Sequence, residues 1–225
     1  MYHTTGFTKA KLAGLRDRIA ANGLKPGMRP WPPILGLRDS LTATLKYLRR
    51  IRTPAEIAED YGVSQSTISR AIAAMTPLIV GALIEFVPTA DSMHDGKQYV
   101  IDGTLFPCWS WRSRSDLWSG KHKTTGMAAL VACTLEGRLF WISDPVRGSR
   151  HDSFITDDSS VLDSVNPMDY IGDKGFVGHD MITPFKKPAG SVLLDWQQEF
   201  NSGVNKIRWV IEQAIAHVKT QCHLA

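Results

Sequence analysis

The sequence predicts an α+β protein in which a helical N-terminal region precedes a mixed β-sheet with helices packed on it. Three observations support this fold class. Apolar residues recur at helical spacing within residues 36–88, short β-rich runs alternate with turns over residues 99–146, and residues 199–221 form one long amphipathic helix. We therefore expect a lead-in at residues 1–35, a helical domain at 36–88 and a sheet domain at 89–225.

The lead-in ends in KPGMRPWPPILG, where four prolines and two glycines exclude a regular helix or a central strand. From Leu37 the pattern changes, because Leu37, Leu41, Leu45 and Leu48 give one apolar helical face. A cluster of positive charge accompanies this segment: Arg38, Lys46, Arg49, Arg50 and Arg52.

The next segment, residues 53–79, predicts a helix, a tight turn and a second helix. Thr53 is placed as an N-cap, with proline next and Glu56 three residues on. Gly62 allows the backbone to turn, and Ser64 caps the second helix. This order and spacing resemble the DNA-binding helix-turn-helix.

Short polar side chains at the start of that second helix suit base edges and phosphates. The candidate DNA-binding residues here are Gln65, Ser66, Thr67, Ser69 and Arg70. The alternative is an ordinary helical hairpin with a polar face.

Charged residues are distributed unevenly along the chain. Residues 1–90 hold 12 Lys and Arg against 6 Asp and Glu, whereas residues 91–225 hold 14 against 16. A basic first part joined to a slightly acidic second part indicates a nucleic-acid contact region attached to another function, although a solvated helical surface has the same balance.

Composition limits the class of protein and its compartment. An apolar content of 43% over 225 residues is that of a globular chain, and no apolar run approaches the length of a membrane helix. No secretory signal is recognisable, and Cys108, Cys133 and Cys222 form neither a disulfide framework nor a CxxC pair. We expect a reducing compartment: the cytoplasm, or the nucleoid if the protein is bacterial.

Two expected strands of the sheet domain end in an acid beside a glycine, Ile101-Asp102-Gly103 and Gly172-Asp173. Strand ends of mixed sheets often carry active-site residues. A third acid, Glu212, lies beside the apolar stripe of the last helix, where an unpartnered charge is costly. Three converging carboxylates would hold divalent cations such as Mg²⁺, which can activate water for phosphodiester chemistry.

Each acid also has a structural explanation. Asp-Gly is a common turn pair, so Asp102 could serve only to turn the chain. Glu212 could pair with Arg208 one turn before it. The pair His151-Asp152 could cap the polar helix that follows the third strand.

Several motifs together resemble a known family: IDGT, WSGKHK, DPVRGSRHD, GDKGF, PFKKP and FNSGVNKIRWVIEQAI. They are similar to DDE-type insertion-sequence transposases of the branch related to Harbinger-like nucleases, over nearly the whole chain. The resemblance implies a ribonuclease-H-like catalytic domain with Asp102, Asp173 and Glu212 as the catalytic and metal-binding triad. It also implies two Mg²⁺ or Mn²⁺ ions, and a homo-oligomer acting on double-stranded terminal-repeat and target DNA.

The last helix carries the spacing Asn205, Arg208, Glu212 and Lys219. It is similar to a tyrosine-arginine-glutamate-lysine pattern of related transposases, with Asn where Tyr would stand. Because Arg208, Glu212 and Lys219 share a face, the two cations would hold DNA phosphates beside the metals. Lys121, His122 and Lys123 would add contacts to the DNA backbone, or else form a solvated hairpin face.

The expected function is that of a transposase that binds transposon ends and catalyses metal-dependent strand cleavage and strand transfer. In this scheme water frees a 3′-hydroxyl, which then attacks target DNA. Residue 225 lies thirteen residues after Glu212, where family members usually continue, so a C-terminally truncated copy is also expected. The alternatives are a catalytically inactive DNA-binding remnant that represses transposition, and a nuclease without strand transfer.

Overall fold

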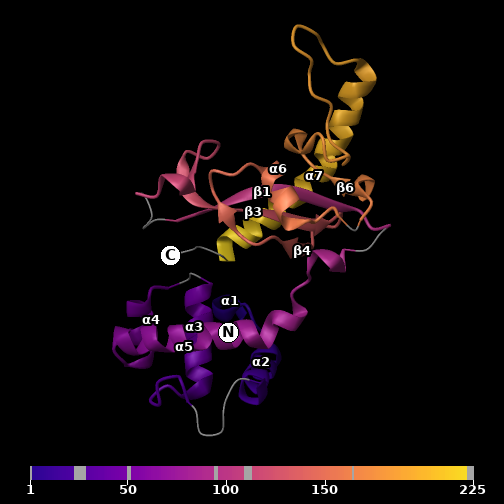
Figure 1. Cartoon of the computed structure of the whole chain (residues 1–225). Helices are drawn as coiled ribbons and strands as arrows, with labels where there is room; N and C mark the ends of the chain where they lie inside the picture. Colours follow the sequence, from indigo (N-terminus) through magenta and orange to yellow (C-terminus); the bar gives the residue numbers. More distant parts are fainter. Residues whose placement is uncertain are drawn as a thin grey trace. The chain divides into compact units, whose positions relative to one another are not determined.

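The structure is a computed structural model that describes residues 2–22, 29–49, 52–93, 96–108, 113–163 and 165–221. Arg50 and Cys222, singled out above, lie outside these residues. The chain forms two compact units, one made mainly of residues 2–87 and the other mainly of residues 88–219. Figure 1 shows the helical unit in indigo to magenta and the sheet unit in magenta to yellow.

The first unit is helical throughout. Its helices are α1 (Tyr2–Thr5), α2 (Lys9–Asn22), α3 (Gly36–Leu48), α4 (Pro54–Tyr61) and α5 (Gln65–Leu83), followed by the short η1 (Ile84–Phe86). Helix α2 lies in the stretch that the sequence left as a lead-in. It contributes Leu12, Leu15 and Ile19 to a core shared with α3 and α5, so the first residues belong to the helical unit.

Local side-chain chemistry sets the boundaries of α4 and α5 as predicted. The Thr53 side chain accepts a hydrogen bond from the Glu56 amide, and the Glu56 carboxylate accepts one from the Thr53 amide. Gly62 ends α4 with φ of 61°, and the Ser64 hydroxyl accepts from the Thr67 amide at the start of α5. Ile57 of α4 and Ile68 of α5 are fully buried where the two helices pack together.

One segment, Gln65–Ser92, is long and apolar enough to cross a membrane by length and composition alone. The expectation that no apolar run reaches that length is therefore wrong. The finding is weak evidence for a membrane span, because the core helix of a soluble protein has the same character. In α5 the side chains of Ile68, Met75 and Ile79 pack into the protein core.

The second unit is built on one mixed sheet. Its strands are β1 (Tyr99–Pro107), β2 (Trp118–Ser119), β3 (Thr124–Thr134), β4 (Leu139–Ile142), β5 (Val146–Arg147) and β6 (Tyr170–Ile171). The path is β2-β3-β1-β6, and β4 and β5 also pair with β3. β1, β3 and β4 form the predicted antiparallel meander, which turns at Gly137, and β6 lies parallel to β1.

Strand β1 does not end at Asp102. It continues to Pro107, and Asp102 and Gly103 pair with Val131 and Leu130 in the middle of the ladder. The interpretation of Asp102-Gly103 as a turn, and of Asp102 as a strand-end residue, is therefore wrong. β6 does stop as predicted, just before Gly172-Asp173.

Helices cover both faces of this sheet. Tyr99, Ile101 and Leu105 of β1 pack with Ile155 of α6 (Asp152–Ser159). Alternate residues point the other way, where Val100 packs with Ile211 and Ala214 of α7 (Asp195–Gln221).

Helix α7, yellow in Figure 1, begins four residues earlier than predicted. Short 3₁₀ turns complete the unit: η2 (Ala90–Ser92), η3 (Ser115–Leu117), η4 (Pro167–Asp169) and η5 (Lys174–Phe176). This mixed α+β architecture agrees with the predicted fold class.

Candidate active site

Asp102 is a partly buried acid in the centre of β1, on the face covered by α7. Its Oδ1 accepts a hydrogen bond from the Gly103 amide at 3.0 Å, and its Oδ2 lies 3.5 Å from Nη2 of Arg208. Burial raises the pKa of Asp102 to about 6; Asp173 and Asp152 add to the rise, while Arg208 and Lys121 oppose it. The carboxylate of Asp102 therefore keeps its proton to a higher pH than an exposed aspartate does.

Asp173 reaches the same place from the neighbouring strand. Because Val100 of β1 pairs with Ile171 of β6 in parallel register, Asp102 and Asp173 each lie two residues beyond a paired position. The Asp173 carboxylate accepts a hydrogen bond of 2.6 Å from the Gly175 amide, which fixes the orientation of the carboxylate at the start of η5. The two aspartates predicted from sequence thus lie within electrostatic reach of each other.

Glu212 does not join them. It is exposed on α7, because the stripe that packs on the sheet consists of Val204, Ile211, Ala214 and Val218 and Glu212 lies to its side. Arg208 reaches Asp102 instead, with its side chain 16% exposed, and no described residue accepts a bond from its buried Nε. The alternative in which Arg208 pairs with Glu212 is not seen, because Arg208 forms an ion pair with Asp102.

The oxygen donors of this region meet the needs of a divalent metal only in part. Asp102 and Asp173 supply the carboxylate oxygens that hard cations prefer. Within the described ranges, however, no three His, Cys, Asp or Glu residues lie close enough to hold a metal ion. The fold brings Asp102 and Asp173 within electrostatic reach of each other, and among the described residues Glu212 does not complete a group of three ligands with them.

Asp152 is a residue of this site that the sequence pattern did not assign to it. It is the first residue of α6, and its carboxylate lies directly against Gly103 of β1. Its Oδ2 is 3.2 Å from the Lys121 ammonium. The sequence signal was Gly103 itself, since a glycine inside a strand often marks the close approach of another group.

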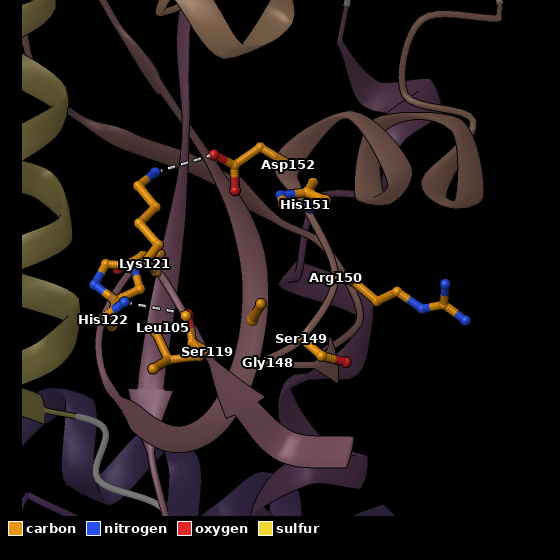
Figure 2. Close-up of a pocket in the computed structure, with 12 residues that line it drawn as sticks. Leu105, Ser119, Lys121, His122, Gly148, Ser149, Arg150, His151 and Asp152 are labelled. Carbon is orange, nitrogen blue, oxygen red and sulfur yellow. Dashed lines mark hydrogen bonds and ion pairs between the residues drawn. The ribbon is translucent and has the colours of Figure 1, made fainter. Parts of the chain in front are cut away.

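A cavity of about 230 Å³ opens beside these residues. Figure 2 shows Lys121 and Asp152 pointing toward each other at its edge, Leu105 and Gly148 below them, and Arg150 extending away. The Arg150 guanidinium instead stacks on Phe154, 4.3 Å from the ring centroid. Of these cations, Lys121 is the one that faces the acids.

Three further basic residues surround this region. Burial lowers the pKa of His122, and Lys121 and Lys219 act in the same direction. Burial also lowers the pKa of Lys219, against the attraction of Asp102, so Lys219 lies within electrostatic reach of Asp102. Lys123 is exposed in the turn before β3, with φ of 49°.

Most of the predicted DNA-binding side chains of α5 are exposed: Gln65, Ser66, Ser69 and Arg70. Thr67 is not, because it is 7% exposed and its hydroxyl bonds with Ser64 at 2.9 Å. Its prediction as a DNA-facing residue is wrong, since the third position of a capped helix turns back toward the cap.

Comparison with known proteins identifies the family to which this chain belongs. The family described as "DDE superfamily endonuclease" matches residues 101–223, a span that contains Asp102, Asp152, Asp173 and Glu212. The chain belongs to the DDE superfamily of endonucleases. Endonucleases of this superfamily generally use divalent metal ions, which agrees with the oxygen donors of the two aspartates.

Two curated relatives extend the similarity to the helical unit. The chain is 27% identical over 215 residues to the "Putative transposase for insertion sequence element IS112" of Streptomyces albus G, covering 93% of this chain and 78% of that protein. It is 27% identical over 206 residues to the "Probable transposase for insertion sequence element IS702" of Microchaete diplosiphon, covering 87% and 73%. No solved structure matches the chain.

Proposed function

We propose that this protein is an insertion-sequence transposase of the Harbinger-like branch, which binds the terminal repeats of its element and catalyses metal-dependent DNA cleavage and strand transfer. The observation that carries the proposal is the family match over residues 101–223, which spans all three predicted acids. The similarity of both units to two proteins named as transposases supports it.

The catalytic unit in this proposal is a ribonuclease-H-like domain. Asp102 and Asp173 would hold Mg²⁺ or Mn²⁺, with Glu212 as the third expected ligand. Ions held there would supply an activated water and charge stabilisation for the attacking and leaving oxygens. Arg208 and Lys219 on α7 bind phosphates of the DNA strand, as do Lys121 and Lys123 from the turn before β3.

Withdrawal of Arg208 from Asp102 is part of this proposal. The Arg208 guanidinium lies 3.5 Å from Oδ2 of Asp102, so it would compete with a metal ion for that oxygen. A DNA phosphate offers Arg208 a second anion, and its Nε donor, which is without a partner among the described residues, can bond to it. Binding of DNA would thereby leave the Asp102 carboxylate open to a cation.

Helices α4 and α5 form the DNA-binding part. The exposed Gln65, Ser66, Ser69 and Arg70 lie at the N-terminal end of α5, the end of a recognition helix that contacts base edges. The basic balance of residues 1–90 favours approach to the duplex. Homo-oligomers acting on paired ends would bring two such units to one element.

A nicking assay on duplex DNA carrying the element's terminal repeat tests this function. We expect cleavage that requires Mg²⁺ or Mn²⁺ and is abolished by Asp102→Ala, with a strand-transfer product when target DNA is added. Asp158→Asn, on the exposed side of α6, is the matched control and should cut normally. Failure of the wild-type chain to cut under all metal conditions would contradict the catalytic proposal.

One observation favours a second candidate, a DNA-binding remnant that occupies repeat ends without cutting. Glu212 is exposed and Arg208 occupies Asp102, so the acids are not assembled in the free chain. Tight, repeat-specific binding with no metal-dependent nicking would identify this candidate. Cleavage without a joined product would identify a nuclease lacking strand transfer.

A further inference from the structure

Gly103 leaves a space in β1 that Asp152 fills. A Cβ atom added to Gly103 would overlap the Asp152 carboxylate, so any side chain at this position would displace it. Gly103 pairs with Leu130 inside the β1–β3 ladder and does not have a positive φ, so the strand itself has no need of glycine here. The contact with Asp152 is what requires the glycine.

The Asp152 carboxylate fixes Lys121 in turn. Its Oδ2 accepts from the Lys121 Nζ at 3.2 Å, across the edge of the cavity in Figure 2. The Asp152 side chain is 19% exposed, whereas that of Lys121 is 61% exposed. Asp102 and Asp173 also act electrostatically on Lys121, so the ammonium lies within electrostatic reach of both candidate metal ligands.

Stability does not explain this arrangement. An ion pair with so exposed a lysine contributes little, because water screens it and the long side chain loses freedom. An acid in the first turn of α6 would favour the helix from any orientation, without reaching β1. The unusual feature is the direction of the contact, from the helix start across to a strand glycine next to Asp102.

We propose that Asp152 is a positioning residue of the catalytic site: seated against Gly103, it holds the Lys121 ammonium where a phosphate of the DNA strand being cut would lie. The inference rests on the proposed nuclease function and assigns to Lys121 a phosphate at that site. Lys121 touches the substrate, and Asp152 acts through Lys121. Gly103 is the third part of the arrangement, because its lack of a side chain leaves room for the Asp152 carboxylate against β1.

A double-mutant cycle in the cleavage assay measures the coupling. Asp152→Asn and Lys121→Met should each lower kcat by about tenfold to a hundredfold, the range for residues that orient a ligand-contacting group. The double variant should cut no more slowly than Lys121→Met alone. Lys121→Arg should retain more activity than Lys121→Met. If the two effects multiply, Asp152 does not act through Lys121 and the inference is wrong.

Gly103→Ala tests the same arrangement by displacing the Asp152 carboxylate without changing Asp152 itself. Its methyl group displaces only the end of the Asp152 side chain, so the fold can persist while Lys121 loses its anchor. We expect the same loss of kcat as in Asp152→Asn, and no further loss when both are combined. Gly203→Ala, where an added Cβ would meet nothing within 4 Å, is the control. Full activity of a folded Gly103→Ala variant would overturn the assignment.

A second readout does not need catalysis. Competitive acetylation of the intact chain, followed by mass spectrometry, reports the reactivity of Lys121 with and without a terminal-repeat duplex. Asp152→Asn should make Lys121 several-fold more reactive in the free protein, and DNA should protect it less than in the wild type. Equal reactivity of Lys121 in the wild type and in Asp152→Asn would contradict the inference. Absence of cleavage by the wild type would instead count against the proposed function, so the two failures can be told apart.

Discussion

The strand acids and the face of α7 differ in how the chain holds their charged groups. Asp102 lies within β1, and Asp173 follows the parallel neighbour β6 after one glycine. Each carboxylate accepts a hydrogen bond from a backbone amide. Glu212 lies on an exposed helical surface and its side chain is free to move into solvent. In the proposed function, the two aspartates are therefore the part of the site that the sheet unit already holds in place, and Glu212 is the part that DNA and metal would have to bring to them.

The largest expected effect comes from breaking the sheet half of the site. Asp173→Asn should lower cleavage by about a thousandfold, because loss of a metal ligand removes several kcal/mol of charge stabilisation in the transition state. The rate of nicking on terminal-repeat DNA in Mg²⁺ measures it. Asp158→Asn should retain the wild-type rate; a loss of less than about tenfold in Asp173→Asn would argue against Asp173 as a ligand.

Glu212 on α7 should contribute to cleavage of bound DNA but not to Mn²⁺ binding by the free chain. Glu212→Gln should lower cleavage strongly, yet leave the Mn²⁺ affinity of the free chain within about twofold of the wild type. Asp173→Asn should lower that affinity by about tenfold or more. Titration with Mn²⁺, followed by electron paramagnetic resonance, makes the comparison, with Glu199→Gln on the same helix as control. An equal loss of Mn²⁺ affinity in Glu212→Gln would show that α7 is already closed.

The pH dependence of stability sharpens the comparison at Asp102. Its pKa of about 6 lies above the ordinary value of 3.8, so the folded chain binds this proton more tightly than the unfolded chain. That contribution to folding is fully present below pH 4 and is lost as the pH rises through 6. Thermal unfolding from pH 4 to pH 8 should therefore favour Asp102→Asn over wild type at the higher pH, by up to about 3 kcal/mol.

The control for this measurement is Asp158→Asn, whose stability should follow the wild type at every pH. A constant difference between wild type and Asp102→Asn across the range would mean that burial does not hold the proton on Asp102. The same titration has a functional consequence, because protons and metal compete for this carboxylate. Mn²⁺ affinity should fall as the pH drops below 6.

The smallest effect is expected in the helical unit. Thr53→Ala removes the N-cap of α4 and should cost about 1 kcal/mol of folding stability. Thermal unfolding measures the loss, and Thr53→Ser should restore most of it. Cleavage by the folded variant should be unchanged at saturating DNA, since the cap is local to α4; a change in kcat would link the cap to the catalytic site.

Features set by neighbouring residues were predictable from the sequence. The capping box at Thr53, the turn at Gly62 and the apolar stripe of α7 depend on contacts a few residues apart, and each is present. The meander of β1, β3 and β4 followed from its turn residues. Helix α2 was missed because its short apolar stripe lies in a polar segment that precedes several prolines.

The site itself depends on contacts between distant parts of the chain, which limits what a pattern can show. Asp102-Gly103 has the composition of a turn, and only the Asp152 carboxylate explains why glycine stands inside a strand. The helical period placed Glu212 beside the stripe, but the rotation of α7 on the sheet brings Arg208 to Asp102. Spacing also failed to show that the Thr67 hydroxyl bonds back to Ser64.

A crystal of the chain soaked in Mn²⁺ tests the central claim most directly, through the anomalous scattering of the ion. The account predicts a peak within bonding distance of carboxylate oxygens from both Asp102 and Asp173, with Arg208 moved away from Asp102. A Mn²⁺ ion bound elsewhere while these two aspartates stay paired with the protein's own cations would contradict it.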